Sequence, residues 1–136
     1  MKDLKLELKT PDAVEAAYYE AFNHCDKQVM ATLWSDGDVV CVHPGSGAIV
    51  GHAAVIRSWE HIFLNAQMPE IHISVTKKTV VDGLAVHLLT EAISTGNETS
   101  ALVFVTNVYQ KFDNGWLMIE HHGSVVQRQQ QENRLQ

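Results

Sequence analysis

The sequence predicts an α+β domain in which helices precede a curved antiparallel sheet of four strands. Apolar residues recur at helical spacing in the first half of the chain, and strand-like runs follow after Pro69. Two of these runs meet at Asp-Gly (82–83) and two at Asn-Gly (114–115), which are strong signals for hairpin turns. This order favours helices packed on one face of the sheet.

Local signals predict the individual elements. Thr10 is a suitable helix cap, Pro11 suits the first helical position and Asp12 suits the first turn. Asp26 is expected to cap a short second helix, and Gly51 precedes a third. The expected elements, in chain order, are a helix from Pro11 to about Cys25, a short helix after Asp26, a strand at 39–43, a helix after Gly51 and strands at about 70–81, 84–95, 100–112 and 115–127.

The 136 residues are expected to form one domain, with an ordered core at about 11–127 and a polar tail at 128–136. A net charge of −6 argues against nucleic acid as a partner, because phosphate binding needs clustered lysine and arginine. No apolar run is long enough to span a membrane, and the N-terminus does not resemble a secretory signal. We therefore expect a cytoplasmic protein in which Cys25 and Cys41 are reduced, buried thiols.

The last hairpin is expected to gather polar side chains on one face of the sheet. A two-residue turn at 114–115 pairs Tyr109 with Glu120 and Asn107 with His122. Because side chains alternate along a strand, these residues would share one face, here called face A. A slip of one residue would exchange the two faces of a strand.

The turn at 82–83 makes a similar prediction for the first hairpin, since it pairs Val75 with Thr90 and places both on face A. A turn at 96–97 would join the two middle strands in the same register. On the second of the four strands, the residues expected on face A are Val86, Leu88 and Thr90, and those expected on the opposite face B are His87, Leu89, Glu91 and Ile93.

Both faces of the last two strands are largely apolar. A sheet with one solvated face should instead carry polar residues there. We therefore expect the helices to cover face A and a second copy of the chain to cover face B, which gives a homodimer. The alternative is that the C-terminal tail covers face B.

The polar cluster on face A is the first candidate for chemistry. A carboxylate such as Glu120 on an apolar floor would have its pKa raised towards neutrality. Glu120, or a neutral His122, could then act as general base, with Tyr109 and Asn107 as hydrogen-bond donors to an enolate or oxyanion. The alternative is a closed structural network in which the same groups satisfy one another.

A small-molecule pocket is expected between the helices and face A. The expected pocket lining consists of Tyr18, Trp34, His43, Trp59, Leu88, Val105 and Met118. The aromatic residues at helical spacing could equally be core, and a loop histidine such as His43 could be a surface or capping residue. We expect no metal, because adjacent His121 and His122 point to opposite faces and no ligand spacing occurs. No nucleotide-binding or serine-hydrolase motif occurs either, and no cofactor is expected.

The chain resembles the nuclear transport factor 2-like superfamily, in its SnoaL-like branch, over about residues 11–127. Besides the order of elements, the local matches are Leu33-Trp34 before an acidic turn, Val42-His43-Pro44-Gly45, Gly51 before the helix with Trp59, Asn107-Val108-Tyr109, Trp116 and His121-His122-Gly123-Ser124. The resemblance implies a cone-shaped, cystatin-like fold with a pocket at its open end and dimerisation through the sheet. Members include ketosteroid-isomerase-like enzymes, polyketide cyclases, dehydratases and non-catalytic modules.

The last strands also resemble the association domain of calcium/calmodulin-dependent kinase II. Its pocket arginines match Leu88 and Asn107 here, so the resemblance does not imply carboxylate binding. His122 and Ser124 match its His-x-His-x-Ser pattern, in which Glu120 replaces the first histidine.

The resulting expectation is a pocket for a partly apolar carbonyl compound, with the acid–base chemistry of an isomerase, cyclase or dehydratase. The alternative is a non-catalytic ligand-binding or dimerisation module.

Overall fold

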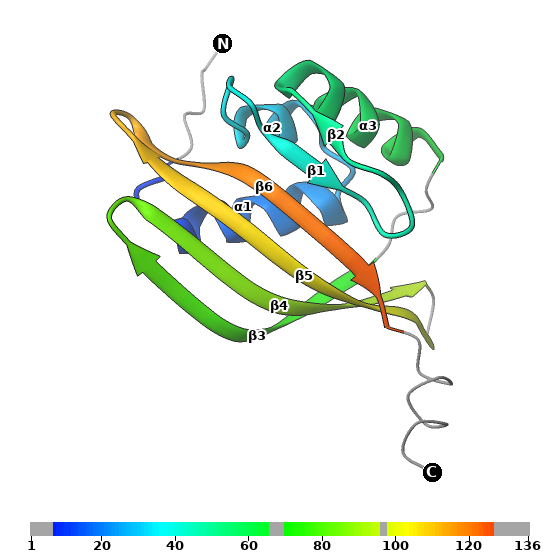
Figure 1. The fold of residues 1–136 in the computed structure, drawn as a ribbon. Coiled ribbons are helices and arrows are strands. Elements are labelled where there is room, and N and C mark those ends of the chain that lie inside the picture. The colour runs from blue at the N-terminus through cyan, green and yellow to red at the C-terminus, as the bar shows by residue number, and fades with distance from the viewer. Residues whose placement is uncertain (1–6, 66–69, 96–97, 127–136) are drawn as a thin grey trace.

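The computed structural model describes residues 7–65, 70–95 and 98–126, which form helices followed by a curved, open sheet (Figure 1). The helices are α1 (Pro11–Asn23), α2 (Lys27–Thr32) and α3 (His52–Asn65). The strands are β1 (Val40–Val42), β2 (Ile49–Val50), β3 (Glu70–Val81), β4 (Leu84–Thr95), β5 (Glu98–Phe112) and β6 (Gly115–Val125). The predicted α+β class is confirmed. The predicted turn at 96–97 and the predicted tail at 128–136 lie outside the described residues.

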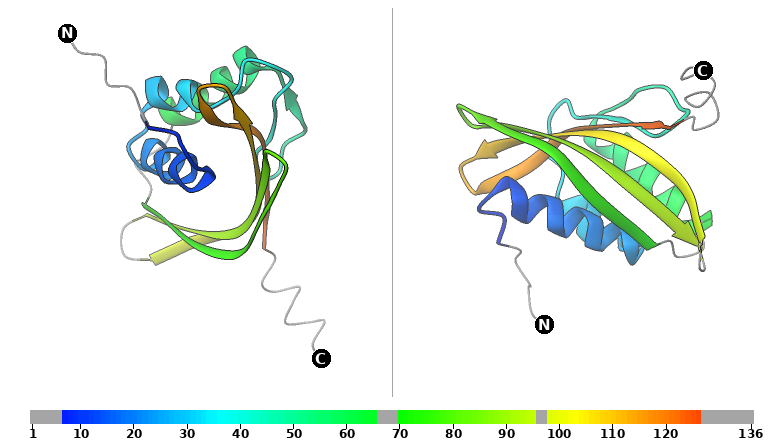
Figure 2. Two further views of the ribbon diagram at one scale, coloured as in Figure 1. Left: turned by 90° about the vertical axis from the view of Figure 1, so that its left-hand side faces the viewer. Right: turned by 90° about the horizontal axis from the view of Figure 1, so that it is seen from below.

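The strand order in the sheet is β2-β1-β6-β5-β4-β3, and the sheet curls around α1 (Figure 2). Neighbouring strands are antiparallel except for β1 and β6, which run parallel. The four long strands form the predicted meander, but β1 and β2 extend it to a mixed sheet. We call the face towards α1 the inner face and the opposite face the outer face.

The predicted helix starts are confirmed by their capping bonds. The Thr10 hydroxyl oxygen accepts a hydrogen bond of 3.0 Å from the Ala13 amide, and Pro11 opens α1. The Asp26 carboxylate accepts one of 3.1 Å from the Val29 amide at the start of α2. These contacts form within one turn, which explains why sequence alone locates them.

The core fills the space between α1, α3 and the inner face. Val14 and Tyr18 of α1 and Trp59 of α3 are buried against the sheet. Buried sheet residues include Val105 and Met118. Because the sheet wraps around α1, the helix contacts β3, β5 and β6 at once.

The first hairpin turns where predicted, since Val81 pairs with Leu84 across 82–83. A β-bulge between Val75 and Lys77 then shifts the register by one residue. Val75 therefore pairs with Leu89 rather than with Thr90. A second register shift, between Ile93 and Ser94, changes how β4 pairs with β5. As a result of the two shifts, the predicted faces of β4 are wrong: Ala85, His87, Leu89 and Glu91 are buried on the inner face, whereas Val86, Leu88 and Thr90 lie on the outer face.

The second hairpin differs from the prediction at two points. Phe112 pairs with Gly115, so the turn residues are 113–114 rather than 114–115. Further along, a bulge at Ile119 shifts the register, because Tyr109 pairs with Met118 while Val108 pairs with Glu120. Beyond the bulge the alternation of faces is reversed.

The reversal changes which residues of β6 face the helices. His121 is buried opposite Asn107, and Glu120 and His122 lie on the outer face. The prediction that Glu120 and His122 share a face with Asn107 and Tyr109 is therefore wrong.

Gly115 joins the N-terminal segment to the sheet. The Trp116 amide donates a 2.8 Å hydrogen bond to the carbonyl oxygen of Leu8. Gly115 has φ +134°, and a Cβ atom there would lie 2.6 Å from that same oxygen. This close approach of the two backbones is compatible only with glycine.

Candidate active site on the inner face

A continuous chain of hydrogen bonds crosses the inner face from β6 to β4. His121 Nδ1 lies 2.6 Å from Asn107 Oδ1, and Asn107 Nδ2 donates to the Tyr19 hydroxyl over 3.3 Å. The Tyr19 hydroxyl donates in turn to Glu91 Oε2 over 2.7 Å. We call this arrangement the His121–Glu91 chain. The Tyr18 hydroxyl lies 3.2 Å from the same His121 Nδ1, so α1 contributes two neighbouring tyrosines to it.

Burial sets the protonation of the two ends of this chain. Glu91 is 3% exposed, and burial raises its pKa to about 7, although the hydrogen bond from Tyr19 opposes the rise. Burial lowers the pKa of His121 to about 3, with smaller contributions from His43 and His122. Near neutral pH the imidazole is therefore uncharged, whereas the Glu91 carboxyl is present in both its protonated and its ionised form.

Each end of the chain has one atom without a protein partner. Within the described ranges, Glu91 Oε1 and His121 Nε2 make no hydrogen bond to a protein atom. Among the described residues, two fully buried side-chain nitrogen atoms have no hydrogen-bond partner, namely the indole nitrogens of Trp34 and Trp59. Glu91 Oε1 and His121 Nε2 are the atoms of this chain of hydrogen bonds that a ligand could engage.

Aromatic rings of α1 and α3 border the chain. Trp59 packs edge-on against Tyr18, with ring centroids 5.7 Å apart, and against Phe22 at 4.8 Å. Phe63 follows at 5.6 Å from Trp59. Phe22 and Phe63 are only half-buried, so this aromatic wall extends from the interior to the surface.

His43 lies after β1 on the same side of the sheet. Its ring packs edge-on against Trp59 at 4.8 Å, and its Nε2 lies 2.9 Å from the Ser58 hydroxyl. Burial lowers the pKa of His43 and raises that of neighbouring Cys41 to about 12. Ser58 donates its proton to the Val55 carbonyl at 2.6 Å, so these groups do not form an activated nucleophile.

A second polar cluster ties the start of α1 to the sheet. Glu15 Oε1 lies 2.6 Å from His87 Nδ1 and accepts a 3.4 Å hydrogen bond from the Tyr109 hydroxyl. Asp12 lies 3.8 Å from His87 Nε2 and also pairs with Lys78 at 2.8 Å. Since His87 has a carboxylate partner at each ring nitrogen, we interpret this cluster as a structural link between α1 and the sheet.

The structure divides the predicted catalytic group among three places. Asn107 is in the His121–Glu91 chain, Tyr109 is in the second cluster, and Glu120 and His122 lie on the outer face. The residues that sequence reasoning missed are Glu91 and His121. The adjacent pair His121-His122 already required one histidine to face the helices, but only the bulge decides which one.

The predicted pocket lining is also divided. Tyr18, Trp34, Trp59, Val105 and Met118 are closely packed core residues with at most 3% exposure. Leu88, predicted on the same face, instead lies on the outer face and is 38% exposed. His43 is half-buried, and its ring packs against the buried ring of Trp59.

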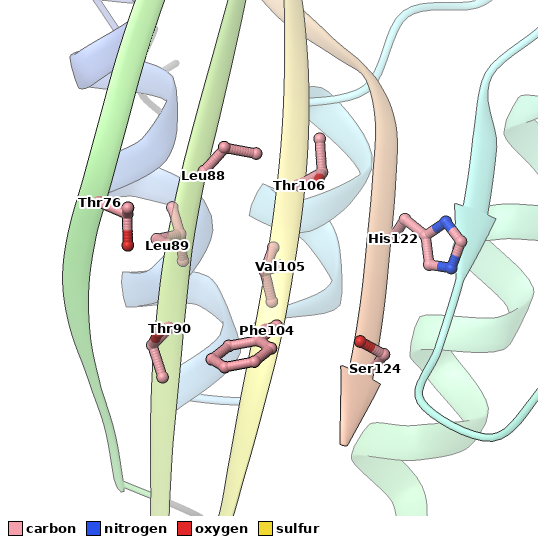
Figure 3. Close-up of a pocket in the computed structure, with 9 residues that line it drawn as sticks. All are labelled: Thr76, Leu88, Leu89, Thr90, Phe104, Val105, Thr106, His122 and Ser124. Atoms are coloured by element: carbon pink, nitrogen blue, oxygen red, sulfur yellow. The ribbon is translucent and has the colours of Figure 1, made fainter. Parts of the chain in front are cut away.

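A hollow of about 500 Å³ lies on the outer face of the sheet (Figure 3). Thr90, Phe104 and Ser124 stand next to one another on β4, β5 and β6 across its floor. The residues lining it are Thr76, Leu88, Leu89, Thr90, Phe104, Val105, Thr106, His122 and Ser124. A second hollow, of about 650 Å³, adjoins the β5–β6 hairpin and Leu8. Neither hollow includes Glu91 or His121.

Two further observations concern metals and thiols. Among the described residues, no group of three or more histidine, cysteine, aspartate or glutamate side chains is placed to hold a metal ion. Cys41 is buried and Cys25 is half-buried, and both are free thiols.

The chain belongs to the SnoaL-like domain family, whose model matches residues 12–128. This assignment agrees with the fold and confirms the family resemblance seen in the sequence. The match covers nearly all of the described residues.

Solved structures with similar folds include two that exceed a quarter sequence identity. One, from Thiobacillus denitrificans ATCC 25259, is provisionally described as a calcium/calmodulin-dependent protein kinase type II association domain; it is 29% identical with a TM-score of 0.86, over 90% of this chain and 100% of that one. Another, from Streptomyces avermitilis, is provisionally described as a dehydratase of the nuclear transport factor 2-like family; it is 28% identical with a TM-score of 0.75, over 85% and 93% of the two chains.

A more distant structure shares the fold alone. A ketosteroid isomerase-like protein from Erwinia carotovora atroseptica SCRI1043 is 19% identical, with a TM-score of 0.69 over 90% of this chain and 98% of that one. In sequence, the F-box protein SKIP8 of Arabidopsis thaliana is 27% identical over 100 residues, which is 73% of this chain and 42% of that protein. The chain therefore spans less than half the length of this relative.

Proposed function

We propose that the chain binds a small, partly apolar carbonyl compound at the His121–Glu91 chain and transfers a proton on it, as an isomerase, cyclase or dehydratase does. The observation that carries this proposal is the buried Glu91, because burial raises its pKa to about 7. A carboxyl group with a pKa near the working pH is an effective general acid–base catalyst. Similarity to a provisionally described dehydratase supports the same reaction class.

The atoms around Glu91 suit this role. Its Oε1 has no protein partner in the described part of the chain and is available to a C–H or O–H group of a ligand. Its Oε2 accepts a hydrogen bond of 2.7 Å from the Tyr19 hydroxyl, which restrains the position of that oxygen. An apolar or aromatic portion of the ligand would contact the half-buried rings of Phe22 and Phe63. The proposal moves the proton-transfer role from Glu120 to Glu91.

The test is carbon-bound hydrogen exchange, which does not require knowledge of the natural substrate. Acetophenone and cyclohexanone are incubated with the protein in D₂O, and loss of the protons next to the carbonyl is followed by proton NMR. We expect the wild-type protein to accelerate exchange and Glu91→Gln to reduce that acceleration by at least about 100-fold, the usual contribution of a general base.

Glu120→Gln is the matched control, because it makes the same change on the outer face. It should retain the wild-type exchange rate. Retained exchange in Glu91→Gln with loss in Glu120→Gln would return the role to the residue predicted from sequence. No acceleration by the wild-type protein would contradict proton transfer on simple ketones.

We also propose that the chain forms a homodimer through the outer face of its sheet. Phe104 is 52% exposed there beside the half-exposed Leu88, so a second copy would remove apolar surface from water. The similarity to a provisionally described association domain supports self-association. If proton transfer is absent, a non-catalytic dimerisation module is the second candidate function.

Native mass spectrometry tests the dimer and also detects any retained small molecule as added mass. We expect a dimer for the wild-type protein and a monomer for Phe104→Glu, because the new carboxylate would be buried without a partner. Val80→Glu is the control, since Val80 is 60% exposed but lies on the inner-face side of β3. A monomeric wild-type protein, or equal loss of dimer in both variants, would contradict this interface.

The remaining expectations from sequence stay predictions: a cytoplasmic location and no nucleic-acid partner. No helix in the described residues is long and apolar enough to cross a membrane.

A further inference from the structure

The His121–Glu91 chain has a definite direction when Glu91 is ionised. A carboxylate only accepts, so the Tyr19 hydroxyl must donate to Glu91 Oε2. The Tyr19 oxygen can then accept from Asn107 Nδ2, which leaves Asn107 Oδ1 to accept from His121. The imidazole proton is therefore on Nδ1, and the free Nε2 carries a lone pair.

Protonation of Glu91 allows the hydrogen bonds to run in the opposite direction, because the carboxyl group can then donate. A proton on Glu91 Oε1 would find no acceptor among the described residues, whereas on Oε2 it can donate to the Tyr19 oxygen. The Tyr19 hydroxyl must then donate onwards to Asn107. A half-turn of the Asn107 amide exchanges its oxygen and nitrogen with little change in shape, so the amide can accept from Tyr19 and donate to His121 Nδ1.

We propose that the protonation state of Glu91 selects the tautomer of His121, through reversal of the hydrogen-bond chain that Tyr19 and Asn107 form between them. With Glu91 ionised, His121 Nε2 is a hydrogen-bond acceptor. With Glu91 protonated, the imidazole proton resides on Nε2, which becomes a donor. Asn107 and Tyr19 are thus positioning residues, which act on a ligand through His121 and Glu91.

The energetics favour the two fully paired arrangements over mixed ones. A mixed arrangement places two donors or two lone pairs face to face inside a buried site, at a cost of about 1–3 kcal/mol for each unsatisfied group. Asn107 is fully buried and His121 is 3% exposed, so water has little room to relieve such a mismatch. The Tyr18 hydroxyl, 3.2 Å from His121 Nδ1, cannot donate to that nitrogen while it carries the proton, and in the reversed arrangement it shares the one lone pair there with Asn107.

No other titratable group that faces Glu91 or His121 in the described residues is expected to change its charge near neutral pH and so to change the His121 tautomer. Glu91 faces Tyr18 and Tyr19 of α1, whose pKa values are both raised by burial, and it pairs across the sheet with apolar Ile73 and Val103. His121 faces His43, Cys41 and Tyr18 and is followed in sequence by His122. His43 and Cys41 are uncharged near neutrality because burial lowers the pKa of the first and raises that of the second.

The consequence for a ligand rests on the function proposed above. Before proton uptake, His121 Nε2 would accept from a hydroxyl or amide N–H of the ligand. Glu91 would take the proton on Oε1, and a half-turn of the carboxyl group would then bring that proton to the position of Oε2, beside the Tyr19 oxygen. With the chain reversed, the same nitrogen of His121 would donate to a carbonyl or enolate oxygen. The site would thus change its hydrogen-bonding preference in step with the proton transfer at its other end.

The test uses the full chain with ¹⁵N-labelled histidine and ¹³C-labelled glutamate, without any ligand. Long-range ¹H–¹⁵N spectra distinguish the two imidazole tautomers, and the carboxyl carbon shift reports ionisation of Glu91. The pH is varied from about 5.5 to about 8.5, which brackets the transition expected for a carboxyl with a pKa of about 7. Because burial lowers the pKa of His121 to about 3, any change there reports tautomer and not charge.

We expect His121 to change from the Nε2–H to the Nδ1–H form as pH rises, with the same midpoint as the Glu91 carboxyl. Tyr19→Phe should abolish this correspondence, because it removes the hydroxyl that links the two. Glu15→Gln, which alters the other buried carboxylate of α1, and His122→Gln, next to His121, should each leave it unchanged.

A single His121 tautomer over the whole range, while Glu91 titrates, would overturn the proposal, and so would a change that persists in Tyr19→Phe. The wild-type titration decides the question even if a variant does not fold. If the His121 tautomer changes with pH but the protein does not accelerate hydrogen exchange on ketones, only the proposed function is contradicted. Exchange activity with a fixed tautomer would contradict this inference alone.

Discussion

Replacing Glu91 with glutamine is expected to remove a stability penalty that the wild-type protein incurs as pH rises. Below pH 4.5, the ordinary carboxyl pKa, Glu91 is protonated in both the folded and unfolded states. Above the folded-state pKa of about 7, folding must bury a charge that the unfolded chain leaves in water. The favourable contribution of the protonated carboxyl is thus fully present below the unfolded pKa and is lost as pH rises through the folded pKa.

The expected size follows from the width of that window. A shift from 4.5 to about 7 corresponds to about 3 kcal/mol in the free energy of unfolding. The advantage of Glu91→Gln over the wild-type protein should therefore grow by about 3 kcal/mol between these pH values, measured by urea denaturation. His121 contributes an opposite slope, because burial lowers its pKa to about 3, but that slope is common to both proteins and cancels in their difference.

Glu120→Gln on the outer face is again the control. The difference between its free energy of unfolding and that of the wild-type protein should not change with pH across the same range. A flat difference for Glu91→Gln as well would show that Glu91 is ionised normally in the folded protein. That result would also remove the main support for its proposed catalytic role.

Replacing Asn107 with leucine is expected to destabilise the fold by about 2–4 kcal/mol at neutral pH. The two side chains have similar size, so the packing change is small. The loss arises because His121 Nδ1 and the Tyr19 hydroxyl, both buried, each lose a partner, and an unsatisfied buried group costs about 1–3 kcal/mol. Chemical denaturation monitored by tryptophan fluorescence would measure the change.

Gln110→Leu provides a matched change of an amide to leucine on the same strand but on the outer face. Its expected effect is within about 0.5 kcal/mol, which is usual for substitutions that break no buried interaction. Equal effects of the two substitutions would mean that the hydrogen bonds of Asn107 contribute little to stability.

Features that depend on near neighbours in the chain could be predicted from sequence. Thr10 and Asp26 cap helices through bonds within one turn, and the turn at 82–83 needs only its own two residues. The predicted strands at 70–81 and 84–95 coincide with β3 and β4, and the other two differ only at their ends. The short strand at 39–43 was predicted, but its parallel pairing with β6 was not, because that pairing joins segments far apart in sequence.

The candidate site could not be predicted to the same extent, because it depends on three register shifts, one in each strand pair of the meander. The sheet must bend around α1, and an extra residue in a strand is one way to accommodate a bend. Which residue is extra depends on the helix packed against the strand, and strand periodicity carries no such information. Glu91 and His121 were therefore assigned to the outer side, whereas the face predicted for Asn107 was correct.

The bulge at Ile119 also bears on how this family is compared by sequence. Two homologues that differ only by the presence of this one residue would align almost letter for letter along the last strand. Their interiors would nevertheless contain opposite sets of side chains, so a histidine conserved in the alignment could line the core of one protein and face solvent in the other. Transfer of functional residues between such relatives is sound only after the strands have been superposed in space.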